Sequence, residues 1–318
     1  MKKQLTLMAL AFGITGAMAQ DLTSKKGEQY LPEAKDWCVG IDANPFLNYA
    51  GNFFGKTSPN AAPTFSFLNS NQAVVGKYFV DAETAYRSSL RIGYGSNTQR
   101  QMVTDRFAAG IPTGVPNNYP TLNAQKENSW KHSSSTVGLS VGLEKRRGKT
   151  RLQGYYGGEI GFYISSSKDK FTYGNKLNPF NSVSTNTANP VVTVTNADNF
   201  SGANNIITVN TAGTPTGRIT ERKNGSTFSF GLRGFIGVEY FILPKISLGG
   251  EFGWALGLST QGKSTSKVES IGNTGGTSGD TIGTTTIESA KNGSFKIDTD
   301  NLNSVFGPSG SIRLNFHF

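Results

Sequence analysis

Apolar and polar residues alternate along several segments of the chain. At the carboxyl end, one face of such a segment carries Ile312, Leu314, Phe316 and Phe318. The other face carries Ser311, Arg313, Asn315 and His317. A period of two is typical of a β-strand between an apolar and a polar environment. Strands with this character are predicted at about 37–49, 73–80, 84–95, 135–144, 151–165, 226–242, 246–259 and 309–318.

The connections between these strands alternate in length. Three are short turns, at 81–83, 145–149 and 243–245, and four are long segments. Bacterial transmembrane barrels have short periplasmic turns and long extracellular loops, and they are closed because an open edge would leave backbone groups unpaired in hydrocarbon. The pattern predicts an all-β fold: an eight-stranded antiparallel transmembrane up-and-down β-barrel with four long extracellular loops and three short periplasmic turns. The runs 191–194 and 206–209 are interpreted as a hairpin that extends the third loop.

The amino-terminal residues have the features of a secretory signal peptide. A basic start with Lys2 and Lys3 precedes an apolar run, and Ala17-Met18-Ala19 is a small-residue cleavage site. Cleavage is expected between Ala19 and Gln20. The predicted organisation is a signal peptide at 1–19, a periplasmic segment at 20–36 and the barrel at 37–318. The lone cysteine, Cys38, cannot form an internal disulfide and is interpreted as a small residue of the first strand.

The composition narrows the class further. Only 36% of residues are hydrophobic and the mean hydropathy is −0.33, yet the chain has 39 Gly, 21 Phe, 11 Tyr and 3 Trp. The sequence after the signal peptide lacks the ~18 uninterrupted apolar residues of a spanning helix. In a barrel, only every second strand residue meets lipid, which gives this profile. A secreted β-sandwich would share the alternation but would not explain the spacing of the connections.

One long hairpin resembles a known family. The segment from Phe228 to Leu258 reads FSFGLRGFIGVEYFILPKISLGGEFGWALGL, with alternating glycine and aromatic residues around a tight Pro-Lys turn. It is similar to outer-membrane β-barrel proteins of Bacteroidota, of the small OmpA-like or OmpX-like type without a periplasmic domain. The resemblance implies a location in the bacterial outer membrane and insertion by the barrel-assembly machinery. It also implies that Phe316 and Phe318 form the terminal assembly signal.

The inward face of the predicted barrel is rich in charge. Strand alternation directs acidic and basic side chains inward, and this set is Lys77, Arg87, Arg91, Glu144, Glu159, Arg233, Glu239, Glu251 and Arg313. An eight-stranded barrel is only wide enough for its side chains to fill it, and an isolated buried charge is very costly. These charges are therefore expected to pair as an ionic core. The alternative is a narrow pore whose lining charges select ions.

The remaining features set the expectations for function. The net charge of +10 is interpreted as solvated turns and loops, with contacts to outer-membrane lipid and lipopolysaccharide, and no nucleic-acid partner is expected. His132 and His317 have no evident nucleophile or metal-ligand spacing beside them, so no catalytic residue, cofactor, metal or enzyme activity is predicted. Two function classes remain: a structural or surface-interaction barrel that presents long loops, whose extracellular ligand is unknown, and a small porin.

Overall fold

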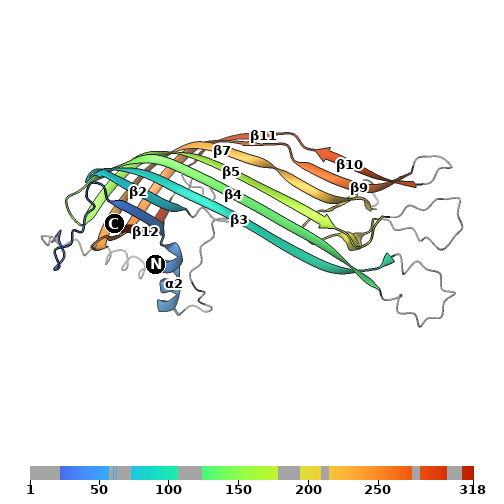
Figure 1. Cartoon of the computed structure of the whole chain (residues 1–318), viewed down its shortest axis with the longest axis horizontal. Helices are drawn as coiled ribbons and strands as arrows, with labels where there is room; N and C mark the ends of the chain where they lie inside the picture. The colour runs from blue at the N-terminus through green and yellow to red at the C-terminus, as the bar shows by residue number, and fades with distance from the viewer. Residues whose placement is uncertain are drawn as a thin grey trace, which may run out of the picture.

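The computed structural model describes residues 22–56, 60, 62, 73–106, 124–177, 194–208, 215–273, 280–298 and 310–318. The all-β class and the antiparallel pairing are confirmed, because these residues form one antiparallel sheet (Figure 1). Its strands are β1 (Trp37–Asp42), β2 (Val74–Asp81), β3 (Thr84–Thr104), β4 (Gln125–Arg147), β5 (Leu152–Thr172), β6 (Ile206–Thr208), β7 (Pro215–Leu243), β8 (Ile246–Gln261), β9 (Thr265–Asn273), β10 (Asp280–Glu288), β11 (Asn292–Asp298) and β12 (Gly310–His317). One α-helix, α2 (Asn44–Phe54), and a 3-10 turn, η2 (Asn196–Asp198), complete the described elements.

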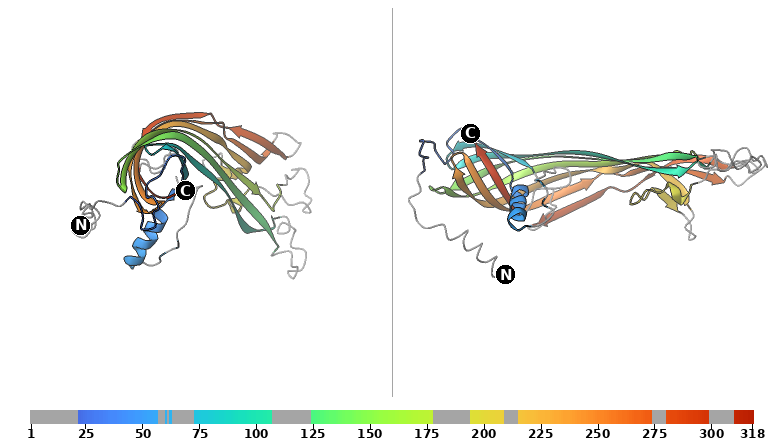
Figure 2. Two further views of the ribbon diagram at one scale, coloured as in Figure 1. Left: turned by 60° about the vertical axis from the view of Figure 1, so that its left-hand side comes forward. Right: turned by 90° about the horizontal axis from the view of Figure 1, so that it is seen from below.

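Eight of the strands pair in a closed circuit. Each strand of the series β1, β2, β3, β4, β5, β7, β8 and β12 pairs with the next, and β12 pairs again with β1. We call this circuit the ring. Figure 2 shows the sheet curving around at the end where the carboxyl terminus lies. Each of the eight strands is therefore paired on both sides over part of its length, and beyond Leu90 the described part of β3 pairs only with β4.

The sheet has twelve described strands, of which eight form the ring. Of the other four, β9, β10 and β11 extend the sheet beyond the ring, and the short β6 pairs with β7. Glu288 pairs with Thr265 and Asn292 pairs with Gln261, so β10 and β11 follow β9 and β8 in one unbroken register. The register against β8 changes between β11 and β12. Asp298 of β11 pairs with Ala255, and Gly310 of β12 pairs with Phe252.

The central strands are much longer than predicted. β3 and β4 pair continuously from Thr84 with Lys145 to Thr104 with Gln125, although loops were predicted beyond residue 95. β5 and β7 likewise extend into the predicted third loop, and β9, β10 and β11 occupy the predicted fourth loop. Figure 1 shows these strands continuing well past β1, β2 and β12. In β3 and β4, the alternation of apolar and polar residues stops partway along the strands. The hydrogen-bonded ladder continues beyond that point through mostly polar residues.

The predicted first strand is shorter than expected, because its second half is helical. β1 ends at Asp42, and α2 starts at Asn44 with Pro45 in its first turn. Proline lacks a backbone N–H and is suited to the first helical turn, so it ends the ladder and starts the helix. α2 has no buried residue, and its exposed apolar side chains are Phe46, Leu47, Tyr49, Phe53 and Phe54.

The distribution of apolar and polar side chains in the ring is the reverse of that in a soluble protein. On β4, Val137, Leu139 and Val141 are about half-exposed, whereas Ser140 and Glu144 are buried. The same inversion runs around the ring, with Ile236, Trp254 and Leu256 among the exposed apolar side chains. Apolar residues therefore face out and polar residues face in.

The short connections are tight. Lys245, between β7 and β8, has φ 64°, and Gly148, between β4 and β5, has φ 129°. Asp36 forms an ion pair with Lys245 at 2.8 Å, and the Arg151 guanidinium lies 4.1 Å from the centre of the Tyr30 ring. The segment before β1 is thus fixed against the turns.

Candidate functional site

The interior of the ring holds a connected cluster of charged side chains, which we call the interior network. Its acids are Glu144, Glu159, Glu239 and Glu251, and its bases are Lys77, Arg87, Arg146, Arg233 and Arg313. They come from β2, β3, β4, β5, β7, β8 and β12, and strand alternation directs all of them to one side of the sheet. The four glutamates are all buried.

One half of the interior network centres on Glu239 and Glu144. Arg146 Nη2 lies 2.6 Å from Glu239 Oε2, and Arg146 Nη1 donates a hydrogen bond of 3.2 Å to Glu144 Oε1. Lys77 Nζ donates to Glu144 at 2.9 Å and lies 3.8 Å from Glu239. Asn315 and Ser247 also donate to Glu239. Each carboxylate therefore has at least two cationic partners.

The other half centres on Glu251. Arg87 forms a two-point pair with this carboxylate, with N–O distances of 2.5 and 3.0 Å. Arg233 Nη1 bridges Glu251 at 2.9 Å and Glu159 at 3.0 Å, and Arg313 approaches Glu251 at 3.2 Å. Arg87 also lies 3.7 Å from Glu144, which joins the two halves. Such fork-like arginine pairs are among the stronger polar contacts in proteins.

Aromatic rings fill the space between the charges. Phe79, Phe235 and Phe241 are buried in the interior, and the guanidinium of Arg87 lies 4.2 Å from the Phe235 ring centre. Lys77 Nζ lies 4.8 Å from the Tyr155 ring centre. A side chain at Gly253 would lie 2.5 Å from the Arg233 guanidinium and would displace it, so glycine leaves room for Arg233 there. The interior is packed with side chains at this level.

The structure brings together eight of the nine predicted interior charges. Arg91 lies farther along β3, opposite Gly138, and is half-buried above the interior network. Arg146 was missed, because 145–149 was interpreted as a solvated turn, but β4 continues to Arg147. His317 faces Glu239 at 3.2 Å. Phe316 and Phe318 have exposed side chains, while Ala19 and Gln20 lie outside the described residues.

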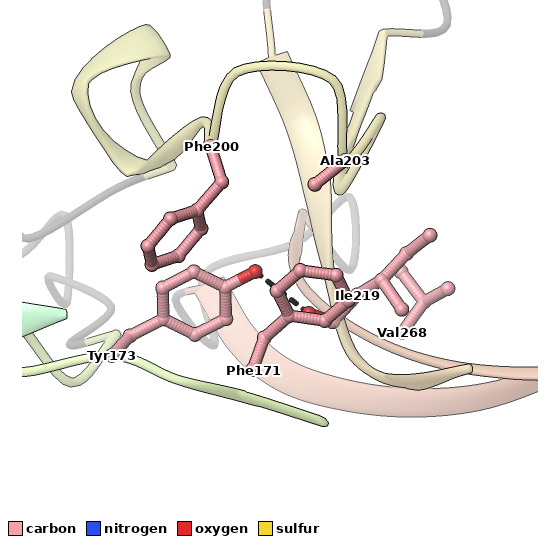
Figure 3. Close-up of a cluster of buried hydrophobic side chains, with 6 residues drawn as sticks. All are labelled: Phe171, Tyr173, Phe200, Ala203, Ile219 and Val268. Carbon is pink, nitrogen blue, oxygen red and sulfur yellow. Dashed lines mark hydrogen bonds between the residues drawn. The ribbon is translucent and has the colours of Figure 1, made fainter. Parts of the chain in front are cut away.

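A second cluster lies at the far end of the extended strands, and we call it the tip core. Its buried residues are Phe171, Tyr173, Phe200, Ala203, Ile219 and Val268 (Figure 3). Trp130 and Ile207 pack against it. Phe200 and Ala203 belong to segment 194–208, which folds back on the ends of β5, β7 and β9. The predicted third-loop hairpin is different: β6 pairs with β7, and 191–193 lies outside the described residues.

Hydrogen bonds to Asp198 hold segment 194–208 in place. Arg106 Nη2 donates to both Asp198 oxygens, at 2.8 and 3.1 Å, and Asn128 donates at 3.3 Å. Asn205 donates to the Asp198 carbonyl and to the Tyr173 hydroxyl, both at 2.9 Å. Tyr173 donates to the Ile219 carbonyl at 2.7 Å, and burial raises the pKa of its phenol. Asp198 is fully buried, so this segment is a folded part of the protein.

His132 lies beside the tip core. Its Nδ1 is 2.7 Å from Asp169 Oδ1, which also accepts a hydrogen bond of 2.9 Å from Trp130. Asp105 pairs with Lys126 at 3.1 Å. Within the described stretches, no three His, Cys, Asp or Glu side chains could hold a metal ion. No helix there is both long and apolar enough to cross a membrane.

Comparisons with known proteins give little. No family model and no curated protein match this chain. A crystal structure of a major outer membrane protein from Thermus thermophilus aligns over 89% of this chain and 98% of its own length, with 8% sequence identity and a TM-score of 0.30.

Proposed function

We propose that the chain is an eight-stranded β-barrel of a bacterial outer membrane, with a closed interior and a structural or surface-interaction role. The observation that carries this proposal is the interior network. Four buried glutamates and five cations, interleaved with aromatic rings, occupy the inside of the ring. Charges that pair with one another and contact aromatic side chains would leave little room for a water path between the two ends.

The outward face supports a membrane location. β-Structure crosses hydrocarbon as a closed set of paired strands, and the closed circuit of eight strands supports this arrangement. Its exposed apolar side chains would contact lipid, and α2 adds an apolar surface beside them. Beyond this zone, the extended strands carry the tip core on the same side as the long connections. The barrel would thus hold a folded platform outside the cell.

The closed interior can be tested directly. The protein reconstituted into planar bilayers is expected to give little or no steady conductance, because the interior network fills the ring. Arg146→Gln and Glu239→Gln variants, checked for heat-modifiable gel migration, serve as comparisons. A steady, ion-selective conductance in the parent protein, altered by these substitutions, would favour the porin alternative instead.

The orientation gives a second test. In a Cys38→Ala background, cysteines at Ser201 or Thr286 are expected to react with a membrane-impermeant thiol reagent on intact cells. Cysteines at Ala82 or Lys149, in the short turns at the opposite end, are expected to react only after lysis. All four positions are exposed, so the difference reports the side of the membrane and not burial. The reverse labelling pattern would invert the proposed topology.

A further inference from the structure

Two neighbouring rows of outward-facing residues in the extended strands are rich in lysine. In the first row, cross-strand partners on β3, β4, β5, β7 and β9 are Ser96, Ser133, Lys168, Lys223 and Thr265. In the second, two residues farther from the ring, they are Thr98, Lys131, Lys170, Glu221 and Lys267. We call the five lysines of these rows the lysine belt. All five side chains are exposed.

The lysine belt faces away from the tip core. On β5, Lys168 and Lys170 alternate with the buried Asp169 and Phe171, and they share the face of Phe162 and Ile164. That face carries the apolar side chains of the ring. The lysines therefore continue the outer, lipid-facing surface in the direction of the tip.

The charges in the lysine belt are not balanced by its own acid. Glu221 has three lysines around it, with Nζ–O distances of 2.8 Å to Lys168, 3.6 Å to Lys223 and 3.7 Å to Lys267. The hydrogen bond from Lys168, together with the other two ammonium groups, holds the pKa of Glu221 below its usual value. Two other acids of these strands are engaged elsewhere: Glu288, which lies opposite Thr265 in the first row, pairs with Lys263, and Glu127, farther along β4, pairs with Arg100.

Two direct cross-strand pairs are of like charge. Lys131 lies opposite Lys170, and Lys168 lies opposite Lys223. Side chains in such positions have Cβ atoms about 4.5–5.5 Å apart, and like charges there are destabilising. Glu221 already lies between Lys168 and Lys223. The cross-strand partners of Lys131 are Thr98 and Lys170, so an anion that enters beside Lys131 and Lys170 would relieve their repulsion.

The position of the lysine belt indicates which anion. The outward row of Ile92, Val137, Ile164 and Phe228 is apolar, and the next row holds Tyr94, Ser135 and Ser166. Lys168 follows Ile164 by four residues, which is ~13 Å along a strand and roughly 10 Å along the membrane normal for a strand tilted by about 40°. The interfacial layer of a bilayer is about 5–8 Å deep on each side. Lysine stems can lie along apolar surface toward this layer.

We propose that the lysine belt binds the phosphorylated sugar headgroup of an outer-leaflet glycolipid. The apolar row would contact the acyl chains, the hydroxyl row would meet the sugar, and the lysines would contact the phosphates. This inference rests on the proposed outer-membrane location and names a lipid partner for one face of the barrel, which spans β4, β5, β7 and β9 (Figure 1).

The test uses native mass spectrometry of the full-length protein in detergent, titrated with bisphosphorylated lipid A or with its dephosphorylated form. The parent is expected to prefer the phosphorylated lipid. Substituting Lys168, Lys223 and Lys267 together by glutamine should weaken that binding on the order of a hundredfold, from the usual contribution of a basic residue near an anionic surface. The matched control, glutamine at Lys25, Lys26 and Lys149 near the opposite end of the ring, should bind like the parent.

A stability measurement supplies an independent readout. Without lipid, Lys131→Gln should raise the melting temperature, because its cross-strand partners are Thr98 and Lys170 and a like-charge pair is relieved, whereas a structural lysine would lower it. Equal binding of both lipid forms, or displacement by millimolar inorganic phosphate alone, would overturn the glycolipid assignment. Heat-modifiable migration and outer-membrane fractionation of the parent test the barrel proposal separately. If both are observed but the lipid-binding experiment fails, only this inference is wrong.

Discussion

Glu251→Gln is expected to lower the free energy of unfolding by about 3–5 kcal/mol, the usual cost of removing one partner of a buried ion pair. The Glu251 carboxylate is nearly inaccessible and contacts Arg87, Arg233 and Arg313. Glutamine keeps the shape of the side chain and removes its charge. Three guanidinium groups would then remain in a space lined by aromatic rings, where Glu159 alone cannot neutralise them. Urea unfolding in detergent or lipid vesicles measures the change.

Phe252→Leu is the matched control, because Phe252 follows Glu251 on β8 and points outward. Its loss should cost much less, since lipid can occupy the space that the ring leaves. If Glu251→Gln were no more destabilising than this control, the interior charges would be hydrated. The proposal of a closed interior would then be wrong. The two variants therefore separate an ionic core from a water-filled pore by stability alone.

The ring was predictable from sequence because its two environments differ so sharply. Apolar side chains outside and charged ones inside give the ring strands a period of two, and Val137 to Glu144 shows this directly. The lengths of the strands could not be predicted from this alternation. Beyond the apolar zone both faces of β3 and β4 are polar, so the period disappears while the backbone pairing continues to Thr104 and Gln125.

The helix α2 and Arg146 were missed for local reasons. Pro45 lies inside a segment that otherwise alternates like a strand. Its missing backbone N–H was the signal that the strand ends before it. Arg146 stands in a run of basic residues that resembles an exposed turn. Its position two residues after Glu144 places both side chains on one face, and this parity was the signal available in the sequence.

The tip core gave a weaker signal. Segment 194–208 is part of a long region rich in Asn and Thr, and no periodicity marks its one turn of 3-10 helix. Phe171 and Tyr173 do continue the inward parity of β5 past Asp169. They indicate that something apolar must cover that end of the strand. Which segment covers it depends on contacts between residues far apart in the chain, and a single sequence does not specify them.

Phe200→Ala is expected to release segment 194–208 from the strands without unfolding the ring. Phe200 is 2% exposed, and its ring lies 6.1 Å from that of Phe171 and 6.2 Å from that of Trp130, centre to centre. Truncating a buried phenylalanine typically costs about 3–5 kcal/mol, through lost burial and the cavity left behind. The segment is held by few apolar contacts, so the loss should appear as local opening. Hydrogen exchange of residues 194–208 measures it.

The control for this prediction is Phe53→Ala, in which the same truncation is made at a side chain that is 65% exposed on α2. It should leave exchange in 194–208 unchanged. In Phe200→Ala, exchange should rise in that segment and at the ends of β5 and β7, while the amides around Glu144 and Glu251 stay protected. Faster exchange throughout the ring would show that the tip core and the ring unfold together. Unchanged exchange would mean that Phe200 does not hold the segment and that the hydrogen bonds to Asp198 are sufficient.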